Sequence, residues 1–125
     1  MGYRSEVVLV VGKELMPFFL HKISGCNAAQ VMCFQDADHM ENDYDNEGAT
    51  LFHWNQIKWY ESWPEVATVQ SFITDCDCGA IPESLDTTDD PGLHFRFIRI
   101  GEDQEDFEDV GSGFHDVFIS RAINF

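Results

Sequence analysis

The segment that decides the fold is VVLVV, residues 7–11. Its run of β-branched residues predicts a strand that is buried on both faces, because a strand with one wet face alternates apolar and polar side chains. We therefore expect this strand at the centre of a sheet, with the other elements arranged around it.

Two elements are expected directly after this strand. Leu15, Phe19 and Ile23 recur at a four-residue spacing, which places them on one face of a helix, and we expect that helix over residues 14–25. Residues 28–34, AAQVMCF, form a short apolar run that predicts a second strand.

An acidic segment and an aromatic segment follow. Residues 36–48 contain six carboxylates, which resist burial, so we expect a solvated turn or hairpin tip there. In the strand expected over residues 51–60, Leu51 and Ile57 share one parity while Phe52 has the other. Both faces of this strand should therefore be covered.

The next predicted element is a second helix. Ser62 followed by Glu65 is a capping box, and the apolar stripe after it has helical spacing. We expect this helix to end at residues 75–79 and the composition of residues 80–92 to give a loop.

The last third of the chain predicts strands separated by acidic sequence. Residues 93–100 read as a strand with Arg96 and Arg99 on opposite sides. Six carboxylates between residues 102 and 109 indicate a second acidic loop, and residues 115–125 can supply one more strand or a hairpin.

The predicted order is strand, helix, strand, strand, helix, strand. This is the ferredoxin-like βαββαβ order of the α+β class, an antiparallel sheet with two helices on one face, here with an extra C-terminal strand or hairpin. With no repeat and no linker, we expect a single domain over residues 1–125.

The charge limits the classes of partner. There are 23 acidic and 7 basic residues, so the net charge is −16. Nucleic acid and anionic membranes should be repelled, because both are bound by clustered cations that this chain lacks. We expect no membrane span and no signal sequence, because the apolar stretches are short and the first thirty residues lack a basic start followed by an apolar run. The field favours a protein with a basic surface.

Three stretches, MGYRSEVVLVV, WNQIKWYESWPEV and FRFIRIGED, together resemble a group of small acidic uncharacterised proteins of tailed bacteriophages. The resemblance covers most of the chain, with the two acidic segments as its variable parts. It implies a phage origin, and hence the cytoplasm of an infected bacterial host. It brings no catalytic residues with it.

No catalytic or metal-binding signature is complete. Residues 43–48 match the start of a calcium loop, but the twelfth position would be Trp54 where a glutamate is required. Cys76 and Cys78 with a histidine form one imperfect zinc pair, and free thiols are the simpler interpretation. We therefore predict no enzyme, no cofactor and no metal, and we keep a metal-binding domain or metal-dependent enzyme as a third hypothesis.

The aromatic residues have two possible roles, as core or as a docking surface. Stacking of nucleic-acid bases is disfavoured because a base platform needs cations beside the rings. Core packing suits Ile57, Trp59 and the helix-facing side of Trp63, which leaves Trp54 or Tyr60 as exposed anchors for a partner protein.

Our leading hypothesis is a phage accessory protein that inhibits a host nucleic-acid-handling protein, of the anti-defence type, as an acidic nucleic-acid mimic. The alternative is a small virion or assembly protein that self-associates to a homo-oligomer. The magnitude of the net charge is greater than solubility requires, which favours the mimic hypothesis. The predicted partner-binding residues are Asp36, Asp38, Glu41, Asp43, Asp45, Trp54, Tyr60, Glu102, Asp103, Glu105, Asp106, Glu108 and Asp109.

Overall fold

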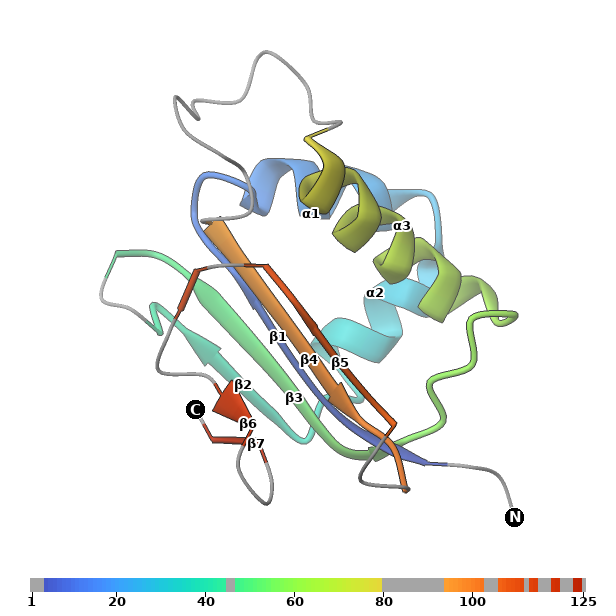
Figure 1. The fold of residues 1–125 in the computed structure, drawn as a ribbon. Coiled ribbons are helices and arrows are strands. Elements are labelled where there is room, and N and C mark those ends of the chain that lie inside the picture. The colour runs from blue at the N-terminus through green and yellow to red at the C-terminus, as the bar shows by residue number, and fades with distance from the viewer. Residues whose placement is uncertain are drawn as a thin grey trace.

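The fold is an antiparallel sheet with three helices, described here from a computed structural model for residues 4–44, 47–79, 94–102, 106–111, 113–114, 118–119 and 123–124 (Figure 1). In chain order the elements are β1 (Ser5–Val11), α1 (Met16–Ser24), α2 (Asn27–Phe34), β2 (His39–Asn42), β3 (Thr50–Ile57), α3 (Pro64–Cys78), β4 (Phe95–Ile100), β5 (Phe107–Val110), β6 (Phe118–Ile119) and β7 (Ile123–Asn124). Five strands form one sheet in the order β2-β3-β1-β4-β5, and β6 pairs with β7.

Strand β1 lies at the centre of the sheet, as its sequence predicts. It pairs antiparallel with β3 on one side and with β4 on the other. Val7, Leu9 and Val11 pack into the larger core cluster with the helices, while Val8 and Val10 pack into a second cluster on the opposite face. The β-branched run is therefore buried on both faces because two different layers cover it.

All three helices cover one face of the sheet (Figure 1). The centre of this layer is aromatic: the Phe19 ring lies 5.0 Å from that of Phe72 on α3 and 5.6 Å from that of Phe52 on β3. These edge-on and tilted contacts are the favoured geometries for ring pairs. They fix α1 and α3 against β3, the strand that carries the aromatic segment.

The prediction of a strand over residues 28–34 is wrong, because this segment forms helix α2. Its buried residues are Ala29, Met32 and Cys33, a spacing of three and four that belongs to a helix face. A short apolar run does not distinguish a strand from a buried helix, and here packing against α3 decides. The second strand is instead β2, inside the acidic segment that was expected to be a solvated turn or hairpin tip, and it forms an antiparallel pair with β3.

The predicted ferredoxin-like order is therefore not reproduced in its simple form. The chain is a single α+β domain, but its order is β-α-α-β-β-α-β-β, with α2 and β5 additional to the prediction. The second acidic segment was expected to be a loop, yet Glu108 and Asp109 lie in β5, because both pair with arginines of β4. The predicted C-terminal hairpin is present as β6 and β7.

Helix α3 begins one residue later than the capping box predicts. Its N-cap is Trp63, and no side chain caps its first turn, so the expected Ser62 cap is wrong. Pro64 occupies the first turn, where its missing donor costs nothing. The helix ends as predicted, at Gly79, whose φ of 80° is the left-handed conformation that glycine adopts most easily.

Candidate functional site

Four of the predicted contact residues lie together along β2 and the segments that flank it. Strand β2 is at the edge of the sheet, and among the described strands it pairs only with β3 (Figure 1). All four side chains are exposed. We call this set the β2 edge acids: Asp36, Asp38, Glu41 and Asp43.

Two of the β2 edge acids also hold the local backbone. Asp38 Oδ2 accepts a hydrogen bond from the backbone N–H of Asn55 at 2.7 Å, which ties the segment before β2 to β3. Asp43 Oδ1 accepts from the backbone N–H of Gly48 at 2.7 Å. Both donors are neutral backbone groups, so neither contact is an ion pair.

The other two β2 edge acids make weaker contacts or none. Glu41 Oε2 lies 3.8 Å from His39 Nε2, and both side chains are about half exposed, so this pair contributes little. Asp36 makes no side-chain hydrogen bond or ion pair with the described residues. Within the described ranges, no lysine or arginine pairs with any β2 edge acid.

The acids on the opposite edge of the sheet are paired with arginines. We call Asp106, Glu108 and Asp109 the β5 acids. Arg99 Nη2 lies 2.8 Å from Asp106, and its Nε donates to Glu108 at 3.0 Å. Arg96 donates to both oxygens of Asp109, at 2.7 and 2.8 Å. The hydrogen bond to Asp106 raises the pKa of Arg99 above its ordinary value, so the guanidinium stays charged.

The remaining predicted acids do not extend either set. Glu102 Oε1 accepts a hydrogen bond from the backbone N–H of Arg4 at 2.9 Å, so it fixes the start of β1. Asp45, Asp103 and Glu105 lie outside the described residues. The β5 acids are thus paired with arginines, whereas the β2 edge acids and Glu102 have no lysine or arginine side-chain partner among the described residues.

Trp54 is a core residue, so the expectation that it serves as an exposed anchor is wrong. Only 2% of its surface is exposed, and its ring stacks on Phe52 at 6.0 Å. Its Nε1 donates a hydrogen bond to the backbone carbonyl of Met32 at 3.0 Å, which satisfies the one polar atom of the buried ring. Trp59 is buried as predicted.

Within the aromatic segment, the rings that reach the surface are Trp63 and Tyr60 instead. Trp63 was expected to pack towards the helix, but 39% of it is exposed, since it stands at the N-cap of α3. Tyr60 is half-buried, and its ring meets that of Trp63 edge-on at 4.9 Å. Burial could not be read from the alternation of residues 51–60, because Tyr60 and Trp63 lie beyond the end of β3.

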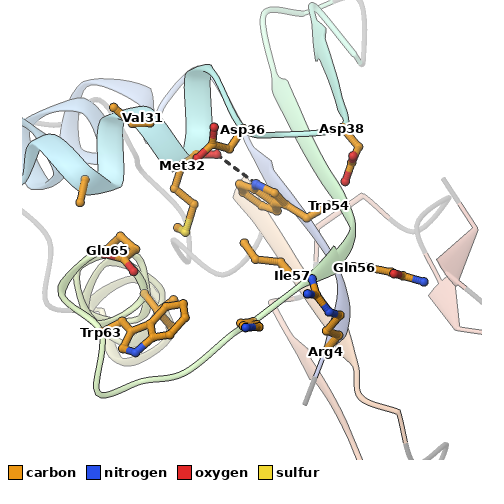
Figure 2. Close-up of a pocket in the computed structure, with 13 residues that line it drawn as sticks. Arg4, Val31, Met32, Asp36, Asp38, Trp54, Gln56, Ile57, Trp63 and Glu65 are labelled. Atoms are coloured by element: carbon orange, nitrogen blue, oxygen red, sulfur yellow. Dashed lines mark hydrogen bonds between the residues drawn. The ribbon is translucent and has the colours of Figure 1, made fainter. Parts of the chain in front are cut away.

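A pocket of about 540 Å³ opens between α2, the start of α3 and the end of β3. Figure 2 shows Met32 on the α2 side, Trp63 on the α3 side, and Trp54 and Ile57 on the sheet side. Trp54 lines this pocket although it is almost fully covered, so it forms part of the floor. The volume is in the range of ligand and anchor pockets.

The rim of this pocket carries charges of both signs. Asp36 lines it near α2, Asp38 lines it beside β3, and Glu65 lines it at the start of α3. Arg4 and Lys58 line the side formed by β1 and β3. The pocket therefore shares two residues with the β2 edge acids, and the two features form one continuous surface.

Histidine is the commonest general base, but the described histidines do not converge on this pocket. His53 Nε2 lies 2.8 Å from Glu6 Oε2, and His94 Nδ1 lies 3.3 Å from Glu14 Oε2. Neither histidine lines the pocket. His115 lies outside the described residues. The two described pairs are separate contacts. A chain with 23 acidic residues places some carboxylates beside histidines by chance.

The cysteines are separate thiols. Burial raises the pKa of Cys33 to about 12, and burial followed by the nearby Asp75 charge raises that of Cys76 to about 12. Cys78 is exposed and Cys26 half-buried. In the described part of the chain, no three His, Cys, Asp or Glu side chains form a group that could hold a metal ion.

Comparisons with known proteins give no relative. No protein-family model, curated protein or solved structure matches the chain. None of the helices in the described ranges is long and apolar enough to cross a membrane. Arguments about function therefore depend on the chain's own residues.

Proposed function

We propose that this protein works by binding a basic surface of a partner protein through the β2 edge acids, and not by catalysis. The observation that carries the proposal is the contrast in pairing. The β5 acids are neutralised by Arg96 and Arg99, whereas the β2 edge acids are exposed and have no lysine or arginine partner among the described residues. A set of this kind presents its negative charge to whatever approaches.

The partner we propose is a host protein that handles nucleic acid, such as a defence or transcription factor. Such a protein carries a basic groove, and carboxylates spaced along a strand edge can occupy it in place of phosphates. The net charge of −16 supports this class of partner. The resemblance to phage proteins supports a host target of the anti-defence type, reached in the cytoplasm of the infected cell.

The mechanism is competition. Complementary charge would speed the encounter, and the sheet edge would then exclude nucleic acid from the groove sterically. We also propose that β1, α1, β2, β3, α3 and β4 derive from a ferredoxin-like arrangement to which α2 and β5 were added. The strand order β2-β3-β1-β4 supports this proposal.

The test is a capture experiment with matched charge reversals. Tagged protein is incubated with nuclease-treated bacterial lysate, and bound proteins are identified and quantified at low and high salt. The edge variant is Asp36→Lys with Glu41→Lys. The control is Glu61→Lys with Asp77→Lys, which reverses two exposed acids away from β2 and changes the net charge equally.

We expect a nucleic-acid-binding protein that is lost at high salt, displaced by duplex DNA, and retained by the control but not by the edge variant. With purified partner, two reversals should weaken binding by about 100-fold, because like charges in contact cost several kcal/mol. If both variants retain the partner protein equally, the β2 edge acids do not contribute to binding.

The second candidate is an assembly protein that self-associates. The observation that favours it is Phe107, which lies on edge strand β5 with 55% of its surface exposed. A large exposed ring on a strand edge is a typical contact between copies. Light scattering across a range of concentrations decides: a rising mass that Phe107→Ser reduces would support this candidate over the first.

A further inference from the structure

Three carboxylates line the pocket between α2, α3 and β3; Asp38 is held by a backbone N–H, and the other two have no partner in the described part of the protein. Asp36 lines it near α2 and Glu65 at the start of α3 (Figure 2). Neither makes a side-chain hydrogen bond or ion pair with a described residue. By contrast, Lys22 of α1 is paired with Asp75. The two pocket carboxylates are thus available to a cation from outside.

The same pocket is also lined by an aromatic ring at the start of α3. Trp63 is 39% exposed and lines the pocket two positions before Glu65. Its ring is restrained by the edge-on contact with Tyr60 at 4.9 Å. A restrained indole face next to carboxylates suits a guanidinium group, which stacks on aromatic rings while its edges donate hydrogen bonds.

The floor suits the stem of a long side chain. Met32, Ile57 and Val66 line it together with the covered ring of Trp54. Long cationic side chains bury their methylene groups on apolar surface and keep the charged end at a polar rim. A pocket with an apolar floor and acidic groups on part of its rim matches that division.

The other charges on the rim set the orientation of the occupant. Arg4 and Lys58 line the side formed by β1 and β3, and neither forms an ion pair with a described residue. They repel a guanidinium from that side and attract the carbonyl oxygens of the segment that carries it. The cation is thereby directed towards Asp36 and Glu65.

We infer that this pocket binds an arginine side chain of the basic partner. The inference rests on the proposed function, from which it takes the partner's charge, and it adds a specific anchor to a surface that otherwise attracts any cation. Arginine fits better than lysine, because a lysine ammonium is strongly hydrated and has no planar face to stack on Trp63.

The test uses two hexapeptides of equal charge, acetylated and amidated, one alternating glycine with arginine and the other glycine with lysine. Their affinities for the full chain are measured by following indole N–H resonances in NMR spectra. We expect the arginine peptide to bind about fivefold more tightly, the gain that stacking of a cation on an exposed ring provides. The largest shift should be at the Trp63 indole.

Four variants separate the pocket from the edge. Trp63→Leu should remove the preference for arginine, and Phe107→Leu, at an exposed ring on the opposite edge, should retain it. Glu65→Gln should weaken the arginine peptide and spare the helix, since the glutamine keeps the side-chain shape. If Trp63→Leu does not fold, Glu65→Gln provides the test of the pocket instead. Glu41→Lys should weaken both peptides equally.

The outcomes distinguish the two proposals. Equal binding of both peptides, lowered for both by Glu41→Lys, would overturn the arginine site and leave the proposed function standing. An arginine preference that is lost in Trp63→Leu but insensitive to Glu41→Lys would support the pocket and count against the edge. If neither peptide binds, the arginine site is overturned. The lysate capture experiment would still test the proposed function.

Discussion

The two edges of the sheet carry similar numbers of acids but use them differently. On β5, the carboxylates are held by Arg96 and Arg99, whose side chains are only 13% and 12% exposed. On β2, the carboxylates are exposed and meet only backbone donors or a distant histidine. Acidity on one edge contributes to the fold, and on the other it remains available for a partner.

This difference shows that net charge is a poor guide to a binding surface. A chain with a charge of −16 could use any of its acids for contact, yet those already paired within the fold would have to lose a partner first. Breaking an internal bidentate pair costs more than an exposed contact returns. The unpaired edge is therefore the better candidate.

The largest expected effect on stability is at β5. Replacing both Arg96 and Arg99 by methionine keeps the apolar stems but leaves the β5 acids without cations. We expect the free energy of unfolding to fall by about 3 kcal/mol, as for a partly buried pair that loses one member. Urea denaturation measures it. A loss no larger than that of a surface substitution would mean that the two edges do not differ.

A matched pair of single substitutions compares the edges directly. Asp109→Asn removes the charge from a bidentate pair with Arg96, and we expect it to cost about 1 kcal/mol, discounted for partial exposure. Asp36→Asn should change stability by less than about 0.5 kcal/mol. The same denaturation assay applies to both, and equal losses would contradict the contrast.

Salt should act differently on partner binding and on the stability of the fold. Raising sodium chloride to about 0.5 M shortens the screening length to a few ångströms, which should weaken binding at the exposed β2 edge. Self-repulsion among the acids is screened as well, so thermal unfolding should stay level or rise slightly. A stability that falls together with binding would indicate that the β2 edge acids also hold the fold.

The smallest expected effect on stability is from the variant that we expect to weaken binding most. Asp36→Lys with Glu41→Lys should leave the free energy of unfolding within about 0.5 kcal/mol of the original protein, or raise it, because it relieves like-charge repulsion. Circular dichroism during heating checks this. A marked loss of stability would mean that reduced capture by this variant reports misfolding.

Sequence patterns predicted the parts of the fold that local chemistry determines. The run at residues 7–11 gave a central strand, the four-residue spacing of Leu15, Phe19 and Ile23 gave α1, and Gly79 gave the end of α3. Each of these depends on periodicity or on backbone freedom within a few neighbouring residues. The acidic segment was also recognised as exposed, though not as containing β2.

Other features were decided by tertiary structure. Residues 28–34 form a helix because Met32 and Cys33 meet the core with α3, and a short apolar run carries no such information. Trp54 is buried for the same reason, although it was expected as an exposed anchor. Burial depends on which element lies opposite, and the sequence does not state that.

By itself, the sequence determined the net charge and the central strand. Only the tertiary structure decided which acids are neutralised, because Arg96 and Arg99 reach the β5 acids through antiparallel pairing of β4 with β5. Pairing between strands fixes the neighbours of a charged side chain. Composition fixes only how many such side chains there are.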